Sequence, residues 1–138
     1  MKLLLDTNIF LEIILDQEKA PEAKALLSDK QHELYMSDYS LHSIGLLLFR
    51  RNLHLAFQSF VQDVILIRGT NVLSLELGEI KDIIQAAQKF QLDFDDAYQY
   101  ALSKSTQIVL VSFDSDFDRT DLGRKTPQKI IQGTKSDF

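Results

Sequence analysis

The chain has 138 residues, enough for one domain that buries about 68% of its unfolded surface. Its 45% apolar and 25% charged residues are typical of a globular protein, and the absence of cysteine excludes disulfides, zinc–thiolate sites and thiol nucleophiles. A net charge of −5 argues against a protein that coats nucleic acid through a basic surface, although an enzyme that grips a phosphodiester through a metal remains compatible.

The N-terminal half reads as strand, two helices and strand. Residues 2–5 are a short apolar run bounded by polar residues, which is typical of a buried strand. Apolar residues at helical spacing predict a helix over 8–15, and Pro21 suits the first turn of a second helix. Residues 34–36 are a candidate for a second, shorter strand.

Ser37 opens a long helix, and a further helix is predicted over 53–67. Both carry apolar residues that we expect at the surface, around 46–49 and 53–60. Residues 71–75 alternate weakly and are predicted as a strand, followed by a helix over 77–90.

The C-terminal part adds a helix that Asp95 could cap, and a β-branched strand over 108–111. No element is predicted for the tail around Thr126 and Pro127. Because strands alternate with helices, we predict an α/β fold: a single domain, residues 1–138, whose small, mostly parallel central sheet carries helices on both faces.

The apolar run at the start is interrupted too early for a secretory signal, and later runs are too short for a membrane span, so a cytoplasmic protein is expected.

Acidic residues stand at the ends of the best predicted strands. Asp6 follows the first strand, Asp114 follows the last, and Asp93, Asp95 and Asp96 lie at a helix start between them. Ligands of parallel sheets collect outside the carboxyl ends of the strands, so these groups could converge. Crowded carboxylates raise one another's pKa, and Mg²⁺ or Mn²⁺ relieves the repulsion because both prefer oxygen ligands. The pattern predicts a shared metal site.

Simpler interpretations remain for each group taken singly. Asp6 could cap the next helix, and Asp93, Asp95 and Asp96 could cap the helix that follows them. Asp114, Asp116 and Asp118 could be solvated turn residues. A purely structural set would consist of solvent-facing capping residues.

Other acid-based sites fit poorly. Arg119 and Lys125 occupy the positions at which a calcium loop needs glycine and glutamate. Asn8 replaces the second acid of a phosphatase of the haloacid-dehalogenase type. The histidines are not spaced as ligands, and surface or helix-flank positions are expected for His32, His42 and His54.

Basic residues gather near the C-terminal end. Between residues 119 and 136 a single acid, Asp121, stands among five basic residues: Arg119, Arg124, Lys125, Lys129 and Lys135. This end is the expected phosphate-facing rim.

Three motifs in order, LLLDTN at 3–8, LDFDDA at 92–97 and VSFDSDF at 111–117, resemble those of PIN domains. The resemblance runs from residue 2 to about residue 127 and is greatest to the VapC-type toxins of bacterial toxin–antitoxin pairs. It implies a PIN-like three-layer α/β/α sandwich and a ribonuclease centre that uses Mg²⁺ or Mn²⁺.

The resemblance also implies roles for individual residues. Asp6, Asp96 and Asp114 match the family's first, third and fourth acids, and Asp116 matches an additional acid of some members. The polar residues expected to orient the acids and bound waters are Thr7, Asn8 and Ser112. The family's second acid, usually a glutamate, is replaced by Ser43, which supplies no charge and weakens divalent-ion binding.

Two functions follow from this resemblance. The first is a nuclease of the toxin type, expected to hydrolyse single-stranded or loop RNA to 5′-phosphate and 3′-hydroxyl ends. Arg119, Arg124 and Lys125 would clamp the phosphates. The alternative, because of Ser43, is an inactive PIN-like module that binds RNA or a protein. The exposed apolar helices are compatible with a homodimer or with an antitoxin groove.

Overall fold

The computed structural model describes residues 1–136, with the backbone alone for residues 134–136. In this part of the chain, four parallel strands form one sheet in the order β3-β2-β1-β4. The strands are β1 (Lys2–Leu5), β2 (Glu33–Ser37), β3 (Asn71–Leu73) and β4 (Val109–Val111). Each was predicted, and β1 lies at the centre because its three leucines are fully buried.

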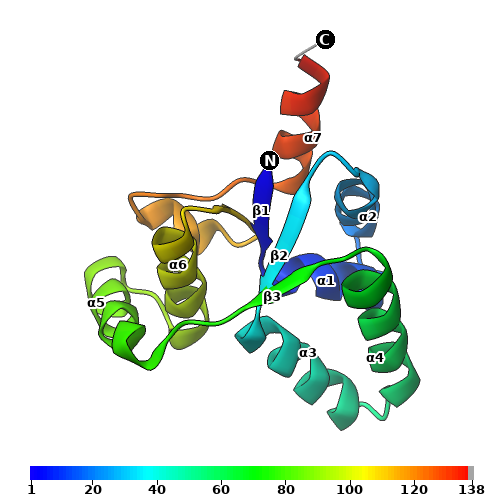
Figure 1. Ribbon diagram of the computed structural model, residues 1–138, viewed down its shortest axis with the longest axis horizontal. Coiled ribbons are helices and arrows are strands. Elements are labelled where there is room, and N and C mark those ends of the chain that lie inside the picture. Colours follow the sequence, from blue (N-terminus) through cyan, green and yellow to red (C-terminus); the bar gives the residue numbers. More distant parts are fainter. Residues whose placement is uncertain (137–138) are drawn as a thin grey trace.

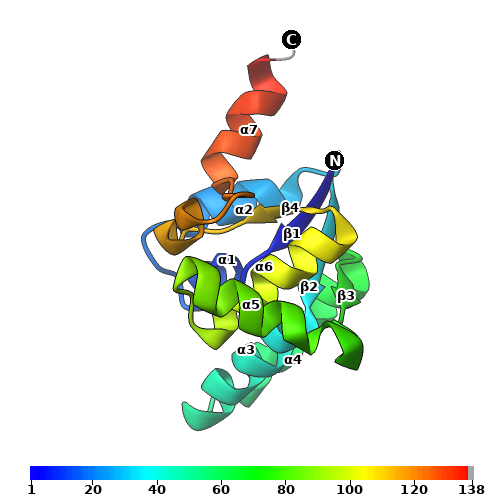
Figure 2. The ribbon, with the colours of Figure 1, turned by 90° about the vertical axis from the view of Figure 1, so that its left-hand side faces the viewer.

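Helices cover both faces of this sheet. They are α1 (Thr7–Ile14), α2 (Ala20–Ser28), α3 (Asp38–Arg50), α4 (His54–Phe60), α5 (Ile80–Phe90), α6 (Phe94–Thr106) and α7 (Pro127–Ser136). Helices α5 and α6 lie on one side of β1 and β2, and α1, α2 and α4 lie on the other (Figure 1). Figure 2 shows α5 and α6 in front of the sheet.

The two helical layers bury alternate residues of the same strand. Leu3 and Leu5 pack in the core beneath α1, α2 and α3, whereas Leu4 packs in the core beneath α5 and α6. This is the period of two that a strand imposes, with side chains pointing to opposite faces. The predicted three-layer α/β/α sandwich is confirmed.

Helix starts are fixed by side-chain caps. Asp6 accepts a hydrogen bond from the Thr7 amide and caps α1, and Ser37 accepts one from Ser40 and caps α3. The prediction that Asp95 caps α6 is wrong. Asp93 does so, accepting from the Asp96 amide, because the capping side chain reaches the third helical residue.

Three segments differ in detail from the predicted elements. The helix predicted over 53–67 is α4 followed by a π-helical segment, η1 (Val61–Ile67), and a 3₁₀ turn, η2 (Leu77–Glu79), precedes α5. The tail forms α7, which packs against α2 with Ile130 in the core. Lys125 makes an isolated parallel bridge to Val111, which extends the sheet beyond β4.

His32 contradicts the prediction of a surface position. It is buried between the N-terminus and Asp29, with ring nitrogens 3.4 Å from the Met1 amine and 3.4 Å from an Asp29 oxygen. Burial lowers the pKa of His32, against the opposing effect of Asp29.

None of the helices in the described chain is long and apolar enough to cross a membrane.

Candidate metal centre

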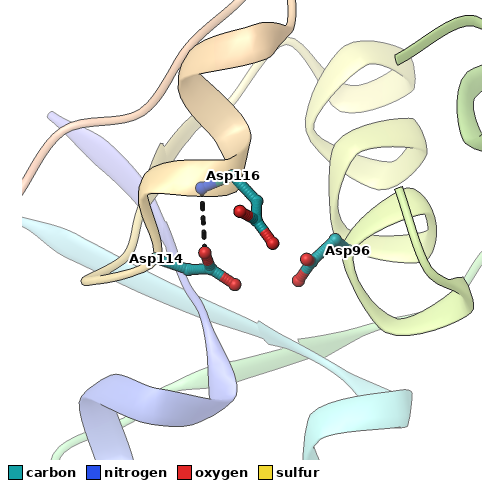
Figure 3. A group of neighbouring side chains, drawn as sticks. All are labelled: Asp96, Asp114 and Asp116. Carbon is teal, nitrogen blue, oxygen red and sulfur yellow. Dashed lines mark hydrogen bonds between the residues drawn. The ribbon is translucent and has the colours of Figure 1, made fainter. Parts of the chain in front are cut away.

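Three carboxylates converge where β4 ends and α6 begins. One oxygen each from Asp96, Asp114 and Asp116 lies within 4.8 Å of the other two, and we call these three residues the acidic triad. Asp96 comes from the first turn of α6, and the other two come from the segment after β4 (Figure 3). Asp114 caps the 3₁₀ segment η3 (Ser115–Arg119), accepting from the Asp116 amide at 2.8 Å, which fixes the two carboxylates side by side.

Asp6 follows β1 and belongs to a hydrogen-bonded group distinct from the triad. Its Oδ1 accepts from the Thr7 amide at 2.8 Å and from Gln99 Nε2 at 3.0 Å, and its Oδ2 accepts from Ser112 Oγ at 2.7 Å. We call Asp6 with Thr7, Ser40, Gln99 and Ser112 the Asp6 network. Asp6 is not among the three acids whose oxygens converge.

Ser112 links the network to the triad. While its hydroxyl donates to Asp6, it accepts from Asn8 Nδ2 at 3.2 Å and from the Asp114 amide at 2.9 Å. Asn8 in turn accepts from the Phe113 amide. The predicted polar positions Asn8 and Ser112 therefore lie between the first and fourth acids and orient both chain segments.

Sequence reasoning missed two members of this network. Ser40 Oγ lies 2.8 Å from Thr7 Oγ1, and Gln99 Nε2 donates to it at 2.7 Å. Both side chains are buried, although each resembles an ordinary polar residue on a helix surface when the sequence is read alone. The available signal was the helical spacing of Gln99, three residues after Asp96 and so on the same side of α6.

The negative charge of the triad is only partly compensated, because Arg119 pairs with Asp116 at 3.1 Å and no described cationic side chain pairs with Asp96. Burial, and then the neighbouring Asp114, Asp93, Asp6 and Asp116, raise the pKa of Asp96 to about 8. No described residue donates a hydrogen bond to the Asp96 carboxylate. Burial also raises the pKa of Asp6, against the opposing effect of its donors Ser112, Thr7 and Gln99. Asp6 and Asp96 are each only 7% exposed, so neither is a solvent-facing capping residue.

Ser43 makes no hydrogen bond with the described residues of either group. It is half-buried on α3, one turn after Ser40. The nearest acid in sequence, Asp38, is occupied elsewhere, accepting from Tyr98 Oη at 2.6 Å. Asp95 likewise accepts from the hydroxyl of Tyr39. The position of the missing acid is therefore not filled by a neighbouring carboxylate.

The three basic residues predicted to clamp phosphates have different surroundings. Arg119 donates to Asp116 at 3.1 Å and to the carbonyls of Phe90 and Gln91, so it ties the triad to the end of α5. Arg124 donates to Asp118 and to the Ser112 carbonyl, and the Lys125 side chain is exposed.

The carboxylates of the triad fit a hard divalent cation. All three offer the oxygen ligands that Mg²⁺ and Mn²⁺ prefer. One of them, Asp96, is buried and accepts no hydrogen bond from a described residue. A cation there would replace the missing donors and favour the ionised form of Asp96. No histidine or cysteine belongs to the group, which argues against a zinc site.

Solved structures share this fold. A toxin–antitoxin complex from Klebsiella pneumoniae matches with a TM-score of 0.70 and 19% identity, over 91% of this chain and 97% of that one. Mycobacterium tuberculosis VapC20, described as a toxin that cleaves the sarcin–ricin loop, matches with a TM-score of 0.73 and 20% identity, over 87% and 95%. VapBC-1 from nontypeable Haemophilus influenzae matches with a TM-score of 0.69 and 22% identity, over 94% and 100%.

Sequence comparison agrees with the fold. A search of curated protein sequences gave no significant match. The PIN domain family model, however, matches residues 3–122, which include the acids at the ends of β1 and β4 and at the start of α6. The chain therefore belongs to the PIN domain family.

Proposed function

We propose that the protein is a metal-dependent ribonuclease of the VapC toxin type, which hydrolyses RNA in the cytoplasm. The observation that supports this most is the acidic triad, in which Asp96, Asp114 and Asp116 present oxygens within 4.8 Å of one another. Membership of the PIN family and the fold shared with VapC20 point in the same direction.

In this proposal the triad holds Mg²⁺ or Mn²⁺, and Asp6 completes the negative pocket. When bound, the cation supplies positive charge for the scissile phosphate and makes a nearby water more acidic. Ser112 and Asn8 keep Asp6 and Asp114 in a fixed relation through their hydrogen bonds, so little reorganisation is needed when substrate binds. Hydrolysis would leave 5′-phosphate and 3′-hydroxyl ends.

The proposed substrate is single-stranded or loop RNA, because unpaired bases and a flexible backbone let the phosphate reach a recessed acid cluster. Lys125, exposed beside β4, is the basic residue proposed to meet a flanking phosphate, because its side chain pairs with no described acid. Arg119 and Arg124 already bind protein groups, so their contribution to RNA binding would be smaller. Binding through Lys125 would weaken with added salt.

A protein partner is proposed for the opposite helical layer. A groove of about 300 Å³ runs between α1 and α4, lined by apolar side chains that include Ile13, Ile14 and Phe60. Three of the solved relatives are complexes or pairs of the VapBC or toxin–antitoxin type, which makes an antitoxin segment the first candidate for this groove. The exposed Leu46, Phe49 and Leu55 on α3 and α4 fit a homodimer contact.

The second candidate function is a PIN-like module that binds RNA or protein without cutting. It is favoured by Ser43, since no other carboxylate fills the place of the second acid. Removing one charge from a four-acid pocket lowers its affinity for a divalent ion, and a second ion would be the first to be lost.

Cleavage of a single-stranded RNA pool in Mn²⁺, by the wild type and by Asp96→Asn, separates the two functions. A nuclease gives metal-dependent products with 5′-phosphate ends, and Asp96→Asn lowers the rate at least a hundredfold while circular dichroism stays unchanged. Cleavage by the variant at the wild-type rate would show that Asp96 is not needed for the reaction. Binding without cleavage in the wild type would favour the module.

A further inference from the structure

Gln99 is a buried amide whose carbonyl oxygen has no partner. The residue is 1% exposed on α6, and its Oε1 is enclosed and makes no hydrogen bond. Nearby positions on the helix, two or three residues away, are the buried and apolar Ala97, Ala101 and Leu102. An apolar side chain would fill this position without leaving an acceptor unsatisfied, so packing alone does not account for a glutamine here.

The orientation of this amide follows from its partners. Nε2 lies 3.0 Å from Asp6 Oδ1 and 2.7 Å from Ser40 Oγ. An ionised carboxylate only accepts hydrogen bonds, so the nitrogen faces Asp6 and the oxygen is turned away from it. Both amide hydrogens are used, one on an acid at the end of β1 and one on the first turn of α3.

Gln99 also sits in a fixed relation to the triad. It follows Asp96 by three residues in α6, which places both side chains on one side of the helix. The same helix turn therefore presents Asp96 to Asp114 and Asp116, and presents Gln99 to Asp6. Ser40, the other partner of Gln99, lies one turn before Ser43 on α3.

We propose that Gln99 is the positioning residue of the acidic pocket: its amide holds the Asp6 carboxylate at a fixed place relative to Asp96. The hydrogen bond from Gln99 to Ser40 also ties α3 to these acids, and α3 is the helix on which Ser43 replaces the usual second acid. This inference rests on the proposed function, because it concerns the affinity of the same pocket for a divalent ion. Groups that orient a metal ligand by hydrogen bonding change metal affinity by about 10–100-fold when they are lost.

The test is a calorimetric Mn²⁺ titration of the wild type, Gln99→Met and Ser103→Ala. Methionine keeps the length of the side chain and removes both donors. Ser103 is a matched control: it is buried one turn further along α6, and its hydroxyl donates to the Ile108 carbonyl at 2.6 Å, away from the acids. We expect Gln99→Met to weaken Mn²⁺ binding at least tenfold and Ser103→Ala to change it less than twofold.

Each outcome decides a separate point. Equal Mn²⁺ affinities for Gln99→Met and Ser103→Ala, with tight binding by the wild type, would overturn the role of Gln99 and leave the proposed function standing. No Mn²⁺ binding by the wild type would overturn the proposed function and the role of Gln99 with it. If Gln99→Met melts below the assay temperature, Ser40→Ala replaces it, with at least a threefold weakening expected and an affinity equal to that of Ser103→Ala contradicting the proposal.

Discussion

The Asp6 network and the acidic triad are linked through Ser112, but they differ in how their buried carboxyl groups are hydrogen-bonded. Both oxygens of Asp6 accept hydrogen bonds, from Thr7, Gln99 and Ser112. Asp96 is buried to the same extent and accepts none from the described residues, and its nearest charged neighbours are other acids. The Asp6 carboxylate is satisfied by donors within the protein. In the triad, Arg119 pairs with Asp116, but Asp96 has no such partner among the described residues, and a cation would supply one.

The Asp6 network and the triad should therefore affect the stability of the metal-free fold in opposite directions. Hydrogen bonds to a buried charge contribute about 1.5–3 kcal/mol each, so the Asp6 network should stabilise the fold with or without metal. Repulsion among like charges costs free energy, so the triad should destabilise the metal-free fold and stabilise the metal-bound one. Variants in the two groups should therefore respond differently to Mn²⁺.

The largest expected effect on stability is that of Ser112→Ala. The substitution removes a donor to Asp6 and leaves Asn8 and the Asp114 amide without their shared acceptor. We expect a loss of about 2–3 kcal/mol in the free energy of unfolding, measured by urea denaturation. Ser115→Ala, at an exposed position of η3, is the control and should stay within about 0.5 kcal/mol. Equal effects would mean that the network adds nothing.

A second effect should appear in the pH dependence of the metal-free protein. The pKa of Asp96 is about 8 in the folded state, against an ordinary value of 3.8. In the unfolded chain Asp96 loses its proton near pH 4, and in the folded protein it keeps it to about pH 8. Its contribution to stability is therefore fully present below pH 4 and is lost as the pH rises to 8.

Thermal melting at several pH values between 5 and 8 measures this loss. We expect it to exceed about 1.4 kcal/mol, the equivalent of a single pKa unit, and to be reduced by Mn²⁺. Asp96→Asn should flatten the profile and melt higher than the metal-free wild type at pH 8. A wild-type profile identical to that of Asp96→Asn would show that the triad carries no strain from repulsion.

The smallest effect is expected from restoring the missing acid. Ser43→Glu should tighten Mn²⁺ binding about threefold if α3 presents this position to the pocket. His42→Glu is the matched control, because it adds the same charge one residue away on an exposed side of the helix. Equal changes in the two variants would mean that only the general field of the added charge is felt, and that α3 turns residue 43 away from the triad.

Most of the fold could be predicted because it depends on local pattern. The apolar run at β1 and the β-branched β4 determine the sheet, and their following acids mark its functional edge. The cap of α6 was expected among neighbouring aspartates, and Asp93 is the one that caps because it stands three residues before Asp96, at the usual capping distance. Helix α7 also had a signal in Pro127, which suits a first helical turn.

The rest depended on contacts between distant segments. Gln99 joins Asp6 across 93 positions of sequence, and Ser40 joins Thr7 across 33, so neither partner is visible from spacing. His32 is buried because the N-terminal amine and Asp29 surround it, and no local pattern signals this. The acids of the site were predicted because charge at strand ends is unusual, and Asn8 and Ser112 were predicted from the family resemblance. Ser40 and Gln99 were missed because single polar residues in helices are common.

The most direct test of a cation-dependent triad is a calorimetric Mn²⁺ titration of the wild type and of Asp114→Asn. Asp114 is chosen because it belongs to the triad and raises the pKa of Asp96 more than any other neighbouring acid. We expect saturable binding by the wild type and at least a tenfold weaker affinity for Asp114→Asn, with both proteins folded. Equal affinities, or no binding by either protein, would contradict this expectation.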